Sequence, residues 1–564
     1  MSSKKYFNLG FSATNIEDKF VKIRASYLLK LIYLLFFVCF IKISFLAILG
    51  VIQGSGESIK NQGKQIRHDI VDRNGNVLAL NIPSTSIFIR PKEIIDKEPA
   101  IIALVKSLKV NEEQIRKVMY SNASFAWVKR NVTEQESLKL RYYGILGIYF
   151  EKEQKRFYPY NNLFAHTVGM TNIDNKGISG IENSFNEEIY NENIKLSLDL
   201  NVQMILHETL VKAQKNNQAK AVYGIIIDPN TSEVLAMVSL PDFNPNDRKN
   251  INVNHMFNNV SQGLFEPGSI IKILTASTAI DTQSIAISDL FDVSKPIVKN
   301  NFLITDFSYM NKQLTTPEVL MYSSNIGSSM MAMKFGVENQ REYLNKFRIF
   351  QSTSLELSEK ETSLLPKKWD DLTSMVLSYG YGIAMSQATF ANAFTAVING
   401  GVYRPLTLLK ANNNEIKAGE QIISPDTSRM MRAMLRLTVA MGYGKKANVV
   451  GYAVAGKTGS AEKQTKGKYL PNSVIASFAG VFPAYNPKYV VVISVDEPKR
   501  VAYNGNNITG GTLATPIMYE IVEKLSTTFG IAKNDDKLNV ENRKNQEYLV
   551  SYVENMPDIT TTEE

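Results

Sequence analysis

Apolar runs of different length alternate with polar segments along this chain, and they predict its elements. The longest run, residues 31–52, has about the length that a helix needs to cross a bilayer, with Lys42 embedded in it. Residues 222–228 and 233–239 are apolar and β-prone on either side of a Pro-Asn turn, which predicts a β-hairpin. Residues 270–280 have almost no charged face, which predicts a buried helix.

Three more β-branched runs lie towards the end of the chain. Residues 450–460, 473–482 and 489–496 predict strands, and the loops between them are short enough for an antiparallel meander. A mostly helical stretch up to about residue 445 separates these strands from the hairpin, and residues 516–529 predict a final helix. The order strands, helices, strands, helix predicts an α+β domain in which an antiparallel sheet carries a helical insert.

The region before residue 219 has a mixed pattern. Asn74-Gly75 lies between two β-prone runs and predicts a hairpin, whereas residues 99–140 predict helix. Arg156 and Glu182 are expected to form a structural ion pair. This part of the chain is therefore predicted to be a mixed, non-catalytic region.

These patterns divide the chain into five segments. In order, they are a cytoplasmic N-terminus (1–30), a transmembrane helix (31–52), the mixed region (53–218), the α+β domain (219–533) and a disordered tail (534–564). The tail is predicted because it is rich in Asn, Asp and Glu with few large apolar residues. The basic N-terminus stays in the cytoplasm by the positive-inside rule, so the rest is exported. A cleaved signal peptide is the alternative, but the apolar run is too long for one.

Charge and cysteine content narrow the function classes. The net charge of +9 suits an anionic partner, without distinguishing nucleic acid from membrane lipid or cell wall. The one cysteine, Cys39, lies in the long apolar run, which excludes disulfides and cysteine-based chemistry from the main body. His207-Glu208 begins a zinc-protease motif, but Val211 stands where its second histidine would be. Neither a cysteine nucleophile nor that type of zinc site is expected.

A candidate nucleophile lies at the start of the predicted buried helix. The turn Pro267-Gly268 places Ser269 at the helix N-terminus, where free backbone N–H groups favour developing negative charge. Lys272 lies one turn further on the same face. Desolvation lowers the pKa of a buried lysine, which can then act as a base for a neighbouring hydroxyl. A helix-cap serine beside a snorkelling lysine is the structural alternative.

Two later polar clusters offer complementary groups. The stretch 322–327 presents the Ser323 hydroxyl and the Asn325 amide two residues apart, and the stretch 455–460 presents Lys457 among glycines and hydroxyls on a predicted strand. Taken alone, the first is more typical of a helix cap or turn, and the second of a solvated strand end.

In this order the three clusters match S-x-x-K, S-x-N and K-T-G, so the chain resembles the penicillin-binding proteins and serine β-lactamases. The resemblance to the class B penicillin-binding proteins covers about residues 25–530. Its further landmarks are Asp72-Arg73-Asn74-Gly75, Arg156-Phe157-Tyr158-Pro159, Gly180-Ile181-Glu182, Phe265-Glu266-Pro267-Gly268-Ser269, Tyr379-Gly380-Tyr381-Gly382 and Ser477-Phe478-Ala479-Gly480. The stretch 323–327 is closer to the septal, division-specific branch than to the elongation branch.

The resemblance implies a single N-terminal transmembrane helix, a pedestal or dimerisation-type domain over residues 53–218, and a penicillin-binding transpeptidase domain over residues 219–533. It implies a D,D-transpeptidase of the inner membrane, with its catalytic domain in the periplasm, that cross-links peptidoglycan stem peptides ending in D-Ala-D-Ala. Neither a metal nor a cofactor is implied.

The resemblance also assigns catalytic roles. Ser269 is expected to attack the penultimate D-Ala carbonyl, and neutral Lys272 to take its proton. Ser323 would relay a proton to the departing D-Ala with electrostatic help from Lys457. Asn325 would hold the stem-peptide amide.

Substrate binding is assigned to the strand that carries K-T-G. The hydroxyls of Thr458 and Ser460, on either side of Gly459, would bind the terminal carboxylate. The backbone N–H groups of Ser269 and Ser460 would form the oxyanion hole. Ser460 stands where threonine is usual in the family and keeps the hydroxyl.

Other functions use the same motifs. The alternatives are an elongation-type transpeptidase, a membrane-bound β-lactam sensor or β-lactamase, and an inactive scaffold.

The expected partners are stem peptides, β-lactams as inhibitors, the membrane, a polytopic glycan polymerase and other division proteins, with no nucleic acid. Lys42 is the candidate for a polar contact within the membrane.

Overall fold

The computed structural model describes residues 30, 33–38, 41–42, 66–411, 418–465, 468–499, 508–533 and 538–559. By internal contacts the chain divides into two compact units, Met1–Gln65 and Ile66–Glu564. The predicted cytoplasmic N-terminus and most of the predicted span 31–52 lie outside the described residues. Within the part of the chain that is described, no helix combines the length and the apolar character needed to cross a membrane.

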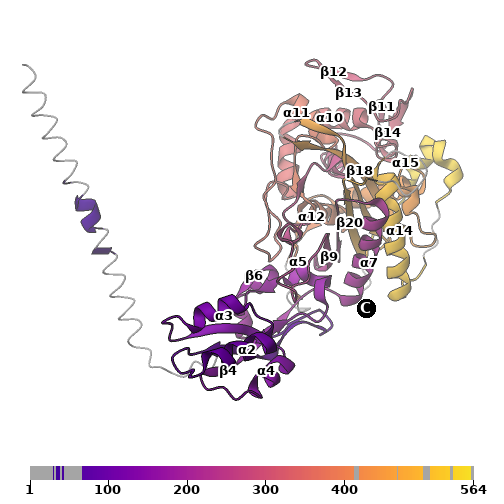
Figure 1. Cartoon of the computed structure of the whole chain (residues 1–564). Helices are drawn as coiled ribbons and strands as arrows, with labels where there is room; N and C mark the ends of the chain where they lie inside the picture. Colours follow the sequence, from indigo (N-terminus) through magenta and orange to yellow (C-terminus); the bar gives the residue numbers. More distant parts are fainter. Residues whose placement is uncertain are drawn as a thin grey trace, which may run out of the picture. The chain divides into compact units, whose positions relative to one another are not determined.

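The first part of the larger unit is a mixed region, which we call the pedestal (Figure 1). Its strands are β1 (Ile70–Val71), β2 (Val77–Ile89), β3 (Ala126–Val132), β4 (Ile148–Phe157), β5 (Met170–Thr171), β6 (Gly177–Ser179) and β7 (Ile194–Lys195). Its helices are α2 (Lys97–Leu108), α3 (Glu112–Met119), α4 (Glu134–Arg141), α5 (Ala165–Val168) and α6 (Gly180–Ser184), with the 3₁₀ turns η1 (Asn161–Phe164) and η2 (Glu188–Tyr190).

Two predictions for the pedestal have different outcomes. The hairpin at Asn74-Gly75 is confirmed, because β1 pairs antiparallel with β2 across this turn. The prediction of helix throughout residues 99–140 is wrong for β3, which pairs antiparallel with the long central strand β2. The charged residues of β3 are accommodated by ion pairs such as Arg130–Glu153 with β4, which pairs with the other edge of β2, a tertiary effect that local pattern does not reveal.

The second part of the larger unit, which we call the catalytic domain, contains the remaining elements. Its strands are β8 (Ala221–Ile227), β9 (Val234–Leu240), β10 (Leu264–Phe265), β11 (Leu290–Asp292), β12 (Ile297–Lys299), β13 (Phe302–Ile304), β14 (Gln313–Thr315), β15 (Met385–Ser386), β16 (Val402–Tyr403), β17 (Glu420–Gln421), β18 (Ala455–Thr465), β19 (Lys468–Phe482) and β20 (Tyr489–Asp496). Its helices are α7 (Leu200–Asn217), α8 (Lys272–Asp281), α9 (Thr316–Met321), α10 (Asn325–Lys346), α11 (Asp371–Ser378), α12 (Gln387–Ile398), α13 (Pro425–Ala440), α14 (Gly510–Thr528) and α15 (Gln546–Glu554), with the 3₁₀ turns η3 (Val253–Met256), η4 (Gly268–Ile271), η5 (Lys445–Ala447) and η6 (Val540–Lys544).

The main sheet of the catalytic domain confirms the predicted antiparallel meander with a helical insert. Its strand order is β18-β19-β20-β8-β9, and all neighbouring pairs are antiparallel. Helices α7 and α14 contact each other and cover one face, whereas α12 and α13 contact the sheet from the helical insert (Figure 1). Both β8 and β9 are buried along their whole length, as expected for strands that are covered on both faces.

The ends of the late elements differ from those predicted. Strand β18 begins at Ala455, not at residue 450, because Tyr452 lies in a turn that precedes it. Helix α14 begins at Gly510, six residues before Pro516, so this proline lies inside the helix. The K-T-G motif lies on strand β18, as predicted.

The prediction of a disordered tail from residue 534 is wrong for residues 538–559. This segment contains η6 and α15, and Leu549, Val553 and Met556 are buried in the main hydrophobic core. The tail is polar in average composition, but its few apolar residues have helical spacing. Their burial against another part of the chain provides the stability that the local composition does not predict.

Candidate active site

Ser269 and Lys272 lie where the chain turns into the buried helix, as predicted. Gly268 has a φ of 53° and starts the turn η4, which continues directly into α8. A Cβ atom at Gly268 would lie 2.6 Å from the carbonyl oxygen of Ser460, so only glycine lets this turn pack against β18. The packing brings the S-x-x-K and K-T-G motifs together.

The Lys272 side-chain amine is the centre of the site. Its Nζ atom lies 2.9 Å from Ser269 Oγ and 3.2 Å from Ser323 Oγ. It also lies 2.7 Å from the carbonyl oxygen of Ser323 and 2.7 Å from Asn325 Oδ1. Lys272 is 1% exposed, so its amine is removed from water and bonded only within the protein. Four side chains that the sequence singled out are therefore in direct contact.

Ser323 and Asn325 lie at the junction between α9 and α10. Ser323 adopts a φ of 55°, an uncommon conformation for a residue other than glycine, and this turn directs both its carbonyl and its hydroxyl oxygen to Lys272. Asn325 is the first residue of α10, and its amide nitrogen donates to the carbonyl oxygen of Thr305 at 2.9 Å. That bond orients the Asn325 amide with its oxygen towards Lys272.

Lys457 approaches the same hydroxyl from β18. Its Nζ atom donates to Ser323 Oγ at 2.8 Å and to the carbonyl oxygen of Thr458 at 3.1 Å, and its side chain is completely buried. Burial lowers the pKa of Lys457 to about 7. The Ser323 hydroxyl therefore lies between two lysine amines.

The electrostatics of the site favour a neutral Lys272. Burial, and then the nearby Lys457 cation, lower the pKa of Lys272 well below its ordinary value, while the Asp306 carboxylate opposes this change. A neutral amine has two N–H donors, which match the two carbonyl oxygens at 2.7 Å. Its lone pair is then available to accept a hydrogen bond from the Ser269 hydroxyl at 2.9 Å. This arrangement makes Lys272 a base for Ser269.

The rest of the K-T-G strand borders the same site. Strand β18 is an edge strand of the main sheet, and Gly459 packs so closely on η4 that a Cβ atom there would lie 3.1 Å from the Pro267 carbonyl oxygen. The Ser460 hydroxyl accepts a hydrogen bond from the backbone N–H of Gly510 at 3.0 Å, which leaves its own proton to donate. Thr458 is 8% exposed.

Sequence reasoning missed Asp306. Its carboxylate accepts hydrogen bonds from the Ser324 hydroxyl at 2.7 Å and from the backbone N–H groups of Asn325 and Ile326, at the N-terminus of α10. It therefore fixes the S-x-N turn, and a carboxylate is favoured at this end of a helix. Asp306 belongs to a loop some twenty residues earlier in the chain, and no short motif links it to the turn.

Glu266 is a second residue whose place the sequence did not assign. It precedes the Pro267-Gly268 turn, and its Oε1 atom accepts a hydrogen bond from the backbone N–H of Gly382 at 2.7 Å. Burial raises its pKa. Glu266 thus ties the loop that carries Tyr381 to the turn before Ser269.

The donor set shows no metal centre. Within the described segments, no group of three or more His, Cys, Asp or Glu side chains is placed to hold a metal ion.

Two family models match the chain. The model of the penicillin-binding protein transpeptidase domain matches residues 222–523, and the model of the penicillin-binding protein dimerisation domain matches residues 64–194. Between them they cover most of the larger unit.

Whole-length relatives agree with these matches. The chain is 30% identical over 506 residues to the probable peptidoglycan D,D-transpeptidase FtsI of Caulobacter vibrioides, covering 87% of this chain and 85% of that protein. It is 29% identical over 571 residues to the peptidoglycan D,D-transpeptidase FtsI of Buchnera aphidicola, covering 92% of this chain and 98% of that protein.

The fold also matches a solved structure. Penicillin-binding protein 3 of Mycobacterium tuberculosis, in its complex with aztreonam, superposes with a TM-score of 0.66 and 24% sequence identity. The match covers 83% of this chain and 97% of that one. The fold of this chain is therefore one that occurs in known proteins.

Proposed function

This chain belongs to the penicillin-binding protein transpeptidase family, as a class B member, and from this membership we propose that it cross-links peptidoglycan during septal cell-wall synthesis. The substrate is a stem peptide ending in D-Ala-D-Ala, and the reaction proceeds through a serine acyl-enzyme with release of D-Ala. Two relatives are named FtsI and are described as peptidoglycan D,D-transpeptidases, which supports this assignment.

One observation carries the proposal. Lys272 Nζ lies 2.9 Å from Ser269 Oγ and 3.2 Å from Ser323 Oγ, and Ser323 Oγ lies 2.8 Å from Lys457 Nζ. A nucleophile, a base, a relay hydroxyl and a cation are thus connected by hydrogen bonds. Such a chain can remove a proton from one end and deliver one to a leaving group at the other.

Acylation begins when Ser269 Oγ attacks the penultimate D-Ala carbonyl and its proton passes to neutral Lys272. The carbonyl π bond opens to an oxyanion, which the backbone N–H groups of Ser269 and Ser460 stabilise. One such donor contributes about 2.7–4 kcal/mol in serine enzymes. When the carbonyl re-forms, the C–N bond breaks, and the proton from Lys272 reaches the departing D-Ala nitrogen through Ser323.

Three groups on β18 bind the substrate terminus. The Thr458 and Ser460 hydroxyls donate to the terminal carboxylate, and Gly459 between them lets β18 pack against the turn that carries Ser269. The Lys457 cation adds electrostatic attraction. Asn325 holds the amide of the stem peptide. An amine from a neighbouring stem then attacks the acyl-enzyme, forms the cross-link and releases Ser269.

The location that we propose follows from the N-terminal part of the chain. Residues 31–52 form a single transmembrane helix of the inner membrane, residues 1–30 are cytoplasmic, and the pedestal and catalytic domain are periplasmic. The predicted domain limits are 53–218 for the pedestal and 219–533 for the transpeptidase domain. We place α7 in the transpeptidase domain, because it packs on β9 and α14, and we extend this domain to include α15, which packs on α13. A lysine at mid-membrane costs roughly 2.5–3.5 kcal/mol on insertion scales, so Lys42 is expected to meet a polar partner, such as a polytopic glycan polymerase of the division machinery.

The test is covalent labelling with a penicillin followed by intact-mass analysis. We expect one stable adduct on the wild-type protein and none on Ser269→Ala, with Ser121→Ala, at an exposed serine of the pedestal, as the control that keeps the adduct. Turnover of the adduct within seconds would favour a β-lactamase. An absence of any adduct would favour an inactive scaffold.

Depletion in cells separates the septal role, which predicts filaments, from the elongation role, which predicts loss of rod shape.

A further inference from the structure

The C-terminal segment 538–559 has a place in the fold that neither family match accounts for. The match to the transpeptidase model ends at residue 523, before this segment begins. Yet Leu549 and Val553 are completely buried and Met556 is 3% exposed. These residues belong to the same hydrophobic core as α8 and α9, which lead to the active site.

On one side, the segment is attached to α13. Arg429 of α13 donates to the carbonyl oxygens of Glu554 at 2.7 Å and of Met556 at 3.2 Å, at the C-terminal end of α15. A cation at this position satisfies free carbonyl groups and the negative end of the helix dipole. In addition, the hydroxyls of Tyr552 and Tyr485 lie 3.1 Å apart. Helix α15 is therefore held at its C-terminus by specific polar contacts.

On the other side, the first residue of α15 reaches α9. Gln546 Nε2 donates to Glu318 Oε2 at 2.6 Å. Glu318 is 1% exposed, and the same carboxylate accepts from the backbone N–H of Thr315 at 3.0 Å, which closes the capping box of α9. A buried carboxylate needs each of its partners, since it has lost its water. Gln546 is thus part of the group that fixes where α9 begins.

Helix α9 leads directly to Ser323. It has only six residues, and it is followed by bonds from Tyr322 N to the Glu318 carbonyl at 2.9 Å and from Ser323 N to the Leu320 carbonyl at 3.2 Å. So short a helix has little stability of its own and depends on its cap and its packing. The position of the Ser323 hydroxyl therefore follows the position of α9.

We propose that the C-terminal segment 538–559 is a brace that positions Ser323 for catalysis, with Gln546 as the positioning residue that transmits its effect through Glu318 and α9. The proposal rests on the role of Ser323 in the proposed function. Removing the brace lets α9 shift, and a shift of Ser323 disturbs the proton relay to the leaving group. A displacement of about 1 Å in a catalytic group costs up to about 100-fold in rate.

A segment that serves only stability would behave differently. It would lower the melting temperature but leave the chemistry of the folded protein unchanged. A brace also changes the environment of Lys272, because both the carbonyl and the hydroxyl of Ser323 are partners of Lys272 Nζ. The other charged groups around this amine are Lys457 and Asp306. The pH dependence of acylation therefore distinguishes the two roles.

The experiment uses the full-length protein in detergent and measures the second-order rate constant for acylation by a fluorescent penicillin between pH 5 and pH 9. The variants are Gln546→Ala, a truncation after residue 533, and Glu547→Ala as a matched control on the exposed side of α15. We expect acylation to fall about tenfold or more in the truncation and about three- to fivefold in Gln546→Ala. The acid limb of the pH profile should shift in both, and Glu547→Ala should match the wild type.

Each outcome bears on one proposal. A synthetic peptide of residues 538–559 should restore the acylation rate of the truncated protein if the segment is a brace. If the truncated protein does not fold, the acylation rates and pH profiles of Gln546→Ala and Glu547→Ala are compared, and this comparison tests the brace. Wild-type rates and an unchanged pH profile in folded Gln546→Ala would overturn the brace. A wild-type protein that is not acylated at all would overturn the proposed function instead.

Discussion

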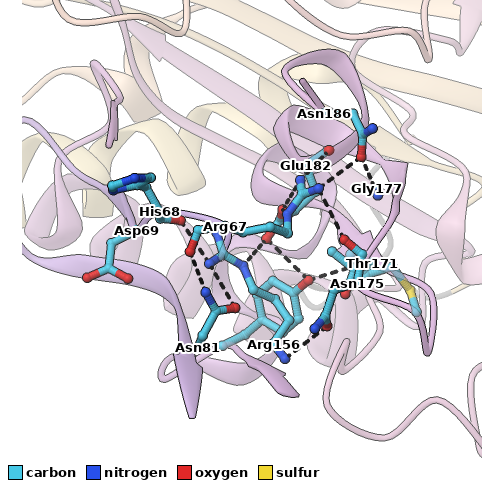
Figure 2. Close-up of polar contacts among 12 residues, drawn as sticks. Arg67, His68, Asp69, Asn81, Arg156, Thr171, Asn175, Gly177, Glu182 and Asn186 are labelled. Carbon is cyan, nitrogen blue, oxygen red and sulfur yellow. Dashed lines mark hydrogen bonds and ion pairs between the residues drawn. The ribbon is translucent and has the colours of Figure 1, made fainter. Parts of the chain in front are cut away.

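The pedestal and the catalytic domain each bury a pair of basic side chains. The two pairs differ in the partner that they share, which is a carboxylate in the pedestal and a neutral hydroxyl in the catalytic domain. In the pedestal, Arg67 and Arg156 share one carboxylate, with Arg67 Nη2 and Arg156 Nε each 2.6 Å from an oxygen of Glu182 (Figure 2). In the catalytic domain, Lys272 and Lys457 share one neutral hydroxyl, that of Ser323. All four basic side chains are almost completely buried.

The comparison shows why buried arginines in one region are structural, whereas buried lysines in another region are suited to proton transfer. Glu182 supplies an opposite charge, and carbonyl oxygens such as that of His68, 2.9 Å from Arg156 Nη1, accept from some of the other guanidinium N–H groups. Arginine in such a site stays charged. Ser323 supplies no charge, so burial lowers the pKa of both lysines. The pedestal pair is therefore structural, as the sequence predicted for Arg156 and Glu182, whereas the lysine pair is suited to moving protons.

The largest expected effect comes from removing the lysine base. Lys272→Met should lower the rate of acylation by penicillin by about 10³-fold, because Ser269 then has no group to accept its proton. The protein should remain folded, since methionine fills the space without a buried amine. The measurement is the acylation rate constant, with the melting temperature recorded beside it.

Lys299→Met serves as the control, because Lys299 forms a surface pair with Asp371. It should acylate like the wild type. If Lys272→Met reacted within tenfold of the wild type, Lys272 would not be the base.

The next effect tests the pedestal pair. Glu182→Gln should destabilise the protein by about 3–5 kcal/mol, because it leaves two buried guanidinium groups without a counter-charge. Folded molecules should still be acylated at the wild-type rate, since the pedestal supplies no catalytic group. Urea unfolding, read together with the acylation rate, measures both quantities.

A matched control is Glu93→Gln, which breaks an exposed ion pair with Arg90 in the same region. An ion pair this exposed to water contributes little to stability. Equal losses for the two variants would mean that burial does not distinguish the Glu182 pair.

The smallest effect concerns stability at the lysine site. The folded-state pKa of Lys457 is about 7, below the ordinary lysine value of about 10.4. Between these two values the unfolded state binds more protons than the folded state, so the contribution of Lys457 to stability rises with pH. Below pH 7 the folded protein bears the full cost of the buried cation. Lys457→Met should therefore raise the melting temperature by a few degrees at pH 6, and by less at pH 9.

Melting curves of both proteins at the two pH values measure this effect. The variant should also lose most of its acylation activity. A melting temperature that changed by the same amount at pH 6 and pH 9 would show that Lys457 does not titrate in this window.

Much of the catalytic domain could be predicted from the sequence. The strands of the main sheet, the buried helix after Ser269 and the three short motifs have patterns that are local and strongly periodic. The spacing of Ser269 and Lys272 needs only one helical turn to become a contact. Their meeting with Ser323 and Lys457 was predicted through resemblance, because no local pattern brings residues more than fifty positions apart together.

Other features depended on distant parts of the chain. Strand β3 is a strand because β2 lies beside it, and the tail around α15 is ordered because α9 and α13 offer it an apolar surface and polar partners. Asp306 contacts the turn that carries Ser323 and Asn325 from a separate loop. Gln546 contacts Glu318 of α9 from a part of the chain far away in sequence. The contribution of these two residues to the site depends on contacts between distant parts of the chain, which composition and periodicity do not predict.

The amino-acid sequence specified which reactive groups this protein has and the order in which they occur. The tertiary structure decided which of these groups are protonated and which partners surround them. A lysine becomes a base only where burial and a neighbouring cation lower its pKa, and an arginine becomes structural only where a carboxylate is buried with it. These conditions are set by the surrounding packing, because the free energy of a charge depends on the water it loses and the partners it gains.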